Sequence, residues 1–266
     1  MDSTLLLMLV GACAGLHSAS WGAFKDSPYE PFLFRKFFRS ILLGILAAFM
    51  AKIFLATQGV HVINLGVMYG IIVVMERAVT ELGKSYFRNE PQDKYKIPSQ
   101  AHFLGKVVKS NTRRMLMGIG YTLAFILFTL GVFAIPTDAI QNRLFAGMLF
   151  GLAGGLLMAL GGGLKDAPIE GFDAVKFMRS PVIGLAAGGV LSSLTDSYGI
   201  VMLAAMGIER MVTEAYKTFV KKSTPGKFKV SKPAYPLWIR DRKIFIIPYL
   251  ASWMAFLLAF TAGINL

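Results

Sequence analysis

The chain of 266 residues is 55% hydrophobic and 16% charged, and its mean hydropathy is +0.57. These values exclude an ordinary soluble globular domain and indicate an integral membrane protein. The net charge of +13 is also typical of nucleic-acid-binding proteins, but basic residues accumulate in the cytoplasmic loops of membrane proteins as well. The single cysteine, Cys13, excludes an intrachain disulfide.

Apolar runs follow one another along the chain, separated by polar or charged segments. The first has the ~20 residues that a membrane-spanning helix needs. A cleavable signal peptide begins with a basic segment, and no such segment precedes this run. We therefore expect the run not to be cleaved off and to form the first span. The eight runs are 5–24, 41–56, 60–75, 115–135, 144–164, 182–194, 199–208 and 244–266. They predict an all-α polytopic membrane protein with about eight transmembrane helices.

A stretch of charged, proline and aromatic residues occurs twice. KDSPYEPFLFRKFFRSILLG at 25–44 and KDAPIEGFDAVKFMRSPVIG at 165–184 agree at ten of twenty positions, with a constant offset of 140 (165 − 25). A second block, ERAVTE at 76–81, recurs as ERMVTE at an offset of 133 (209 − 76). We infer a tandem duplication into two four-helix repeats, 1–135 and 136–266.

The distribution of basic residues predicts the orientation of the helices. Four alternate connections, 25–40, 77–114, 165–180 and 210–243, hold 4, 9, 3 and 10 Lys or Arg, which is 26 of the 28 in the chain. The positive-inside rule places these connections in the cytoplasm and both termini on the other side. Each repeat then has an even number of spans and the same topology, so the pseudo-two-fold axis is expected along the membrane normal. Nucleic acid is not an expected partner.

Charged residues close the third and seventh apolar runs. About twelve residues separate Asp196 from Glu209, which at ~1.5 Å per residue is roughly 18 Å into a core about 30 Å thick. Charges at such depth indicate a functional site. In the alternative interpretation the helix tilts until these residues reach the interface, where arginine and glutamate pair at four-residue spacing. The candidate pathway or binding residues are Glu76, Arg77, Glu81, Glu209, Arg210 and Glu214.

The stretch at 25–44 and its second copy supply another set of candidates. Carboxylates four residues apart suit the oxygen coordination of a divalent cation or the mouth of a pathway, and the basic residues suit a phosphate headgroup of an anionic lipid. In the structural alternative Ser27 caps a short surface helix that begins at Pro28. The acidic candidates are Asp26, Glu30, Asp166 and Glu170, and the headgroup candidates are Lys36, Arg39, Lys176 and Arg179. No cofactor or resident metal is assigned.

Small residues at four-residue spacing predict close packing of helices. They are Gly11 and Gly15, Gly147, Gly151 and Gly155, and Gly184 and Gly188. His17 and Cys13 lie one helical turn apart, but Leu157 and Ala153 stand at these positions of the second copy, so we expect core packing and not a metal pair. The runs 182–194 and 199–208 are short; either they mark a site at the repeat interface or their helices extend into the charged flanks.

Three functions are compatible with these features. The leading hypothesis is a non-catalytic transporter or channel-like protein with a charged site at the repeat interface near the cytoplasmic side, because both copies keep the same charges. The first alternative is a Mg²⁺-dependent enzyme acting on a phosphorylated or prenyl lipid, although Asp-Gly-x-x-Ala-Arg and Ser-Gly-His, the catalytic strings of two classes of membrane lipid enzymes, do not occur. The second alternative is a structural subunit of a membrane complex. The expected partners are the bilayer, anionic lipid headgroups, and a second copy or a larger membrane complex.

Overall fold

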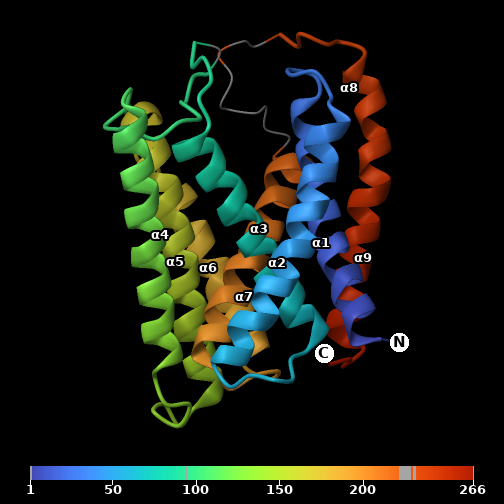
Figure 1. Cartoon of the computed structure of the whole chain (residues 1–266), viewed down its shortest axis with the longest axis vertical. Coiled ribbons are helices and arrows are strands. Elements are labelled where there is room, and N and C mark those ends of the chain that lie inside the picture. Colours follow the sequence, from blue (N-terminus) through green and yellow to red (C-terminus); the bar gives the residue numbers. More distant parts are fainter. Residues whose placement is uncertain (1, 94, 222–228, 230–231, 266) are drawn as a thin grey trace. The chain divides into compact units, whose positions relative to one another are not determined.

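A computed structural model describes residues 2–93, 95–221, 229 and 232–265. Helices dominate these ranges, and one two-stranded antiparallel hairpin interrupts them (Figure 1). The basic connection expected at 210–243 falls partly outside the described residues. The elements are α1 (Ser3–Asp26), α2 (Phe34–Thr57), α3 (Leu65–Leu82), η1 (Gly83–Phe87), β1 (His102–Phe103), β2 (Lys106–Val107), α4 (Asn111–Phe133), α5 (Arg143–Glu170), α6 (Ala174–Leu191), α7 (Tyr198–Ala215), η2 (Tyr216–Val220), α8 (Trp238–Asp241), η3 (Arg242–Phe245) and α9 (Ile246–Thr261).

In the described part of the chain, six helical segments are long and apolar enough to cross a membrane. They are Ser3–Asp26, Phe34–Thr57, Asn111–Phe133, Arg143–Glu170, Ala174–Leu191 and Trp238–Thr261. These helices support the predicted class, an all-α integral membrane protein. The helices α3 and α7 are not among the six, and both carry charged residues near their C-terminal ends. The count of about eight spans stays a prediction.

The two short apolar runs of the second half belong to longer helices. α6 and α7 have 18 residues each, so both helices extend into their charged flanks. α7 continues past Ile208 because no glycine or proline interrupts the next seven positions, and Glu, Arg, Met and Ala favour the helix. These two apolar runs are therefore short because charged residues end them, although the helices that contain them are longer.

The expected surface helix starting at Ser27 is wrong. The Ser27 N–H donates to the Ala23 carbonyl at 3.1 Å, so this residue ends α1. Pro31 lacks an N–H and restricts the residue before it, which prevents a helix from growing through this position. After the break, α2 begins at Phe34 and continues without interruption into the apolar run.

The second copy ends its helix with different chemistry. Gly171 stands at the position of Pro31 and has a φ of +83°, a conformation that favours glycine. α5 runs up to Glu170 with Pro168 inside its last turn. Asp173 then caps α6, since its side chain accepts a hydrogen bond from the Lys176 N–H at 3.0 Å. In both copies the candidate headgroup residues thus lie in the first two turns of a long helix.

Element bounds recur at the two sequence offsets. α1 and α2 begin 140 residues before α5 and α6 (143 − 3 and 174 − 34). α3 and η1 match α7 and η2 at both ends with an offset of 133 (198 − 65 and 216 − 83). The recurring sequence stretches therefore lie in matching elements, while the duplication into two repeats and their pseudo-two-fold arrangement stay predictions.

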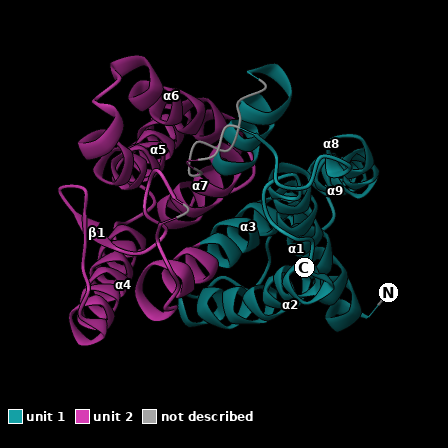
Figure 2. Cartoon of the chain, turned by 90° about the horizontal axis from the view of Figure 1, so that it is seen from above, with its two compact units in different colours: residues 1–77, 210–225, 230–266 teal, residues 78–209, 226–229 magenta. Residues whose placement is uncertain are grey.

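The chain forms two compact units (Figure 2). Unit 1 comprises residues 1–77, 210–225 and 230–266, and unit 2 comprises 78–209 and 226–229. Unit 1 holds α1, α2, the first part of α3, the charged end of α7, and α9. Unit 2 holds α4, α5, α6 and the first part of α7. Each unit combines helices from both halves of the sequence, and the division into repeats at 1–135 and 136–266 stays a prediction.

Glycines set the closest helix contacts in unit 1. A Cβ at Gly44 of α2 would lie 2.8 Å from the Cα of Gly15 in α1, and a Cβ at Gly11 would lie 2.8 Å from the Gly44 carbonyl oxygen. The two backbones therefore touch, which confirms the predicted packing role. α9 packs on the same α1, and the Leu65 N–H at the start of α3 donates to the Ile264 carbonyl at 2.9 Å.

Unit 2 repeats this packing between α5 and α6. A Cβ at Gly184 would lie 2.9 Å from the Cα of Gly155, and a Cβ at Gly188 would lie 2.7 Å from the Cα of Gly151. α4 follows a different route: its Gly118 lies under the ring of Tyr86 in η1. The small-residue motif therefore brings together the first two helices of each sequence copy.

Candidate functional site

Charged residues from the ends of α3 and α7 meet inside unit 1. Nη2 of Arg77 lies 3.0 Å from Oε2 and 3.0 Å from Oε1 of Glu214. Nε of Arg210 lies 2.6 Å from Oε1 of the same carboxylate, which confirms the predicted four-residue pair. Nε of Arg77 also lies 3.8 Å from Oε2 of Glu76. One carboxylate thus bridges two arginines; we call these four residues, with His17, Trp21 and Lys25, the charged cluster.

The cluster is withdrawn from solvent. Glu76 is 0% exposed, Glu214 1% and Arg77 8%. Removing such charges from water costs several kcal/mol per ion, and only close geometry and further hydrogen bonds offset this cost. Folding stability alone is therefore a weak reason to bury them, and buried charges among apolar membrane helices indicate a functional site.

Trp21 of α1 holds the cationic side of the cluster. Lys25 Nζ lies 4.6 Å from the centre of its ring system, the Arg77 guanidinium 4.9 Å and the Arg210 guanidinium 5.9 Å. All three distances are within the range of cation–π attraction. The indole N–H donates to Oγ1 of Thr218 in η2 at 2.9 Å, which fixes the ring in place.

His17 lies one turn before Trp21 and is fully buried. Its Nε2 is 3.9 Å from Oε2 of Glu214, and its ring centre is 4.8 Å from that of Tyr249 and 5.7 Å from that of Trp253. The residue packs in the core as expected, but it packs between the cluster and the aromatic side chains of α9.

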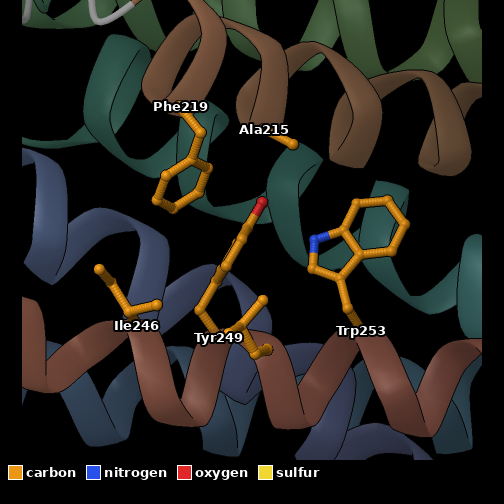
Figure 3. A pocket seen from close by; sticks show the side chains of 6 residues that line it. Ala215, Phe219, Ile246, Tyr249 and Trp253 are labelled. Atoms are coloured by element: carbon orange, nitrogen blue, oxygen red, sulfur yellow. The ribbon is translucent and has the colours of Figure 1, made fainter.

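A pocket of about 510 Å³ is lined by Tyr249, which contacts His17 of the cluster. Figure 3 shows the side chains of its wall. Its wall is apolar and aromatic, and comprises Ala215, Phe219, Ile246, Tyr249, Leu250 and Trp253. The ring centre of Tyr249 lies 5.4 Å from that of Phe219 and 4.8 Å from that of His17. The Trp253 ring centre lies 5.7 Å from that of His17. Two residues of the pocket wall therefore contact the histidine of the cluster.

Comparison of the two sequence copies does not identify Trp21 and His17 as residues of this site. Gly161 and Leu157 occupy the positions of Trp21 and His17 in the second copy, so a search for shared residues passes over both. The usable signal is a spacing of four: His17, Trp21 and Lys25 share one face of α1. The partners from α9 lie more than 220 positions away (249 − 17) and carry no local signal.

Glu209 lies in unit 2 and has a partner of its own. Its Oε1 accepts a hydrogen bond from Oγ of Ser180 at 2.6 Å, and the exposures of the two residues are 2% and 7%. Ser180 is one of the positions that both copies keep. Glu81, also in unit 2, lies 3.1 Å from Lys84 Nζ and 3.9 Å from Lys165 Nζ.

The Ser180 hydroxyl should contribute measurably to stability. Replacing Ser180 by alanine leaves a buried carboxylate without this donor, so we expect the free energy of unfolding to fall by about 1.5–3 kcal/mol. Denaturant unfolding of the purified protein in detergent measures it. Ser193→Ala, whose exposed hydroxyl donates to the Val190 carbonyl, is the control and should change stability by less than about 0.5 kcal/mol. Equal effects of the two substitutions would contradict this role.

The repeated acidic residues hold the repeated lysines. Lys176 Nζ lies 3.3 Å from Oδ2 of Asp166 and 3.3 Å from Oε2 of Glu170. In the first copy Lys36 Nζ lies 3.4 Å from Oε2 of Glu30. Among the residues that the structure describes, no group of three or more His, Cys, Asp or Glu is placed to hold a metal ion. Lysine side chains are thus the observed partners of Glu30, Asp166 and Glu170.

The remaining candidates contribute less to the site. Arg39 is exposed on α2, Arg179 is half-buried on α6, and Asp26 is half-buried at the end of α1.

Comparisons with models of protein families, with curated proteins and with solved structures found no match. The function therefore has to be argued from the charged cluster and its pocket.

Proposed function

We propose that this chain is a membrane transport protein, a transporter or channel-like protein, whose solute site is the charged cluster of unit 1. The observation that carries this proposal is one buried carboxylate shared by two arginines beside an apolar pocket. Six apolar helices long enough to span a membrane supply the setting. Intramembrane ion pairs of this kind are typical of substrate and ion pathways.

The geometry supports exchange of partners. Glu214 binds both Arg77 and Arg210, so a charged solute that replaces the carboxylate at one arginine leaves the other pair intact. An anionic group would bind the arginines, while a cationic group would bind Glu76 or Glu214. The aromatic wall of the pocket would then shield the bound group from water and strengthen its electrostatic contacts.

The position of the cluster is compatible with a site near one membrane face. Five residues (26 − 21) separate Trp21 from the end of α1, which at ~1.5 Å per residue is about 8 Å. Under the positive-inside rule this end is cytoplasmic and both termini lie on the other side. The acid–lysine pairs Glu30–Lys36 and Glu170–Lys176 would stand at the cytoplasmic mouth, where their lysines can also contact anionic headgroups. No observation favours a lipid enzyme, since these carboxylates face lysines.

Flux measurements test the proposal. The purified protein in liposomes is expected to carry one of K⁺, Na⁺, H⁺, Cl⁻ or phosphate down an imposed gradient, recorded with ion-selective dyes or radiotracer. Glu214→Gln should lower this flux at least about tenfold, which corresponds to ~1.4 kcal/mol. The control Asp241→Asn changes an exposed carboxylate that pairs with Arg240 and should keep most of the flux.

Two results would overturn the proposal. One is the absence of flux for every probe under both chemical and electrical gradients. The other is a Glu214→Gln variant that loses stability but carries the same flux per folded molecule, since the cluster would then be structural. Folded protein is quantified by size-exclusion chromatography of the same preparation, so a folding defect is not mistaken for a transport defect.

A further inference from the structure

Arg114 is a buried arginine without an acidic partner in the described part of the chain. It lies in the first turn of α4 and is 2% exposed. Its Nη2 contacts Oδ1 of Asn111, the first residue of the helix, at 2.5 Å, and its Nε is buried without a hydrogen-bond acceptor. The guanidinium is therefore directed back toward the start of α4.

Two physical costs meet at this position. A buried charge without a counterion is strongly unfavourable. The start of a helix also carries a positive partial charge, so a cation in the first turn is repelled. A bound anion would relieve both costs at once, and neither is relieved by the Asn111 amide oxygen alone.

The surroundings of Arg114 are open at the helix start and closed behind it. Asn111, Thr112 and Arg113 are exposed, and so is Lys109 before them. The Ser110 hydroxyl accepts from the Arg113 N–H at 3.3 Å, while the first N–H groups of a helix lack intrahelical acceptors. Gly118, one turn beyond Arg114, is covered by Tyr86. The exposed residues at the start of α4 are therefore the ones that an anion would meet.

We propose that the start of α4 binds a phosphate group. The planar guanidinium matches phosphate oxygens with two parallel hydrogen bonds, the N–H groups of a helix start bind phosphate readily, and Lys109 and Arg113 add positive charge. The group comes from an anionic phospholipid or from free phosphate.

This site is single and independent of the transport proposal. The residue at the offset of 133 from Arg114 is Ile247, which is 71% exposed and carries no charge. The matching position of the second half therefore carries no arginine, and a phosphate at α4 neither requires nor excludes flux through the charged cluster.

Thermal unfolding with defined probes tests the site. The full chain is purified in a maltoside detergent without phosphate, and its Tm is recorded against inorganic phosphate at constant ionic strength and, separately, against phosphatidic acid in mixed micelles. We expect the Tm to rise with at least one of the two probes, because a ligand that binds only the folded state stabilises it. A rise with phosphatidic acid alone assigns the site to a lipid headgroup, and a rise with inorganic phosphate assigns it to the free ion.

Variants at neighbouring arginines make the test specific. Arg114→Met should abolish the rise and, without phosphate, should be at least as stable as the wild-type chain, because it removes a buried charge without a counterion. Arg113→Met changes an exposed arginine and should keep most of the rise. If Arg114→Met fails to fold, Arg114→Lys takes its place and should shift the half-saturating probe concentration upward several-fold. No rise in the wild-type chain, or an equal rise in the Arg114 variant, overturns the proposal.

Discussion

Replacing Glu214 by glutamine should lower the free energy of unfolding by about 3–5 kcal/mol, since breaking one side of a buried ion pair leaves an uncompensated charge. Arg77 is 8% exposed, and its Nη2 lies 3.0 Å from each of the two oxygens of this carboxylate. Glutamine keeps the shape of the side chain and a weaker acceptor, so the loss reports charge and not packing. Denaturant titration of the purified protein in detergent, followed by circular dichroism, measures the effect.

A pair nearer to solvent provides the matched control for this substitution. The side chains of Glu30 and Lys36 are 17% and 44% exposed, and their charged atoms are 3.4 Å apart. Glu30→Gln should therefore cost less than about 1 kcal/mol. In a double-mutant cycle of Glu214→Gln with Arg77→Met, the effects should be non-additive by about 0.5–3 kcal/mol. A cost below about 1 kcal/mol for Glu214→Gln would show that the cluster is not electrostatically coupled.

Local patterns in the sequence predict the features that depend on near neighbours. Hydropathy predicts the positions of the long helices, the spacing of glycines predicts the α5–α6 contact, and the four-residue spacing predicts the pair of Arg210 with Glu214. Each involves residues whose geometry is fixed by one helix or by close backbone approach. The partner of Arg77 is 137 positions away (214 − 77), and no local pattern identifies it.

The Ser27 prediction shows why a local motif can be misread. Ser-Pro-x-Glu is typical of a helix start, but the motif here is followed by Pro31, so the segment closes α1. The contacts of His17 with Tyr249 and Trp253 could not be predicted either, because they form only when α1 and α9 pack together.

Glycine substitutions within α5 should have opposite effects at two positions ten residues apart (161 − 151). A Cβ at Gly151 would lie 2.7 Å from the Cα of Gly188, a backbone atom that cannot move without separating the helices. Gly151→Ala should therefore lower stability by about 1–3 kcal/mol through overpacking. At Gly161 a Cβ would meet open space, so Gly161→Ala should raise stability by up to about 1 kcal/mol, the difference in helix propensity. Thermal unfolding in one detergent compares both with the wild-type chain.

The first sequence copy extends this prediction to unit 1. Gly44 stands at the position of Gly184, and a Cβ on either would lie within 3 Å of the backbone of a facing glycine, Gly15 or Gly155. Gly44→Ala and Gly184→Ala should therefore both destabilise the protein by about 1–3 kcal/mol. A loss at only one of them would mean that close backbone approach does not explain why both copies keep glycine here. Losses at both would mean that the same glycine contact holds α1, which carries Trp21, and α6, which carries Ser180. The charged cluster and Glu209 would then each be held in place by a helix pair that packs through glycines.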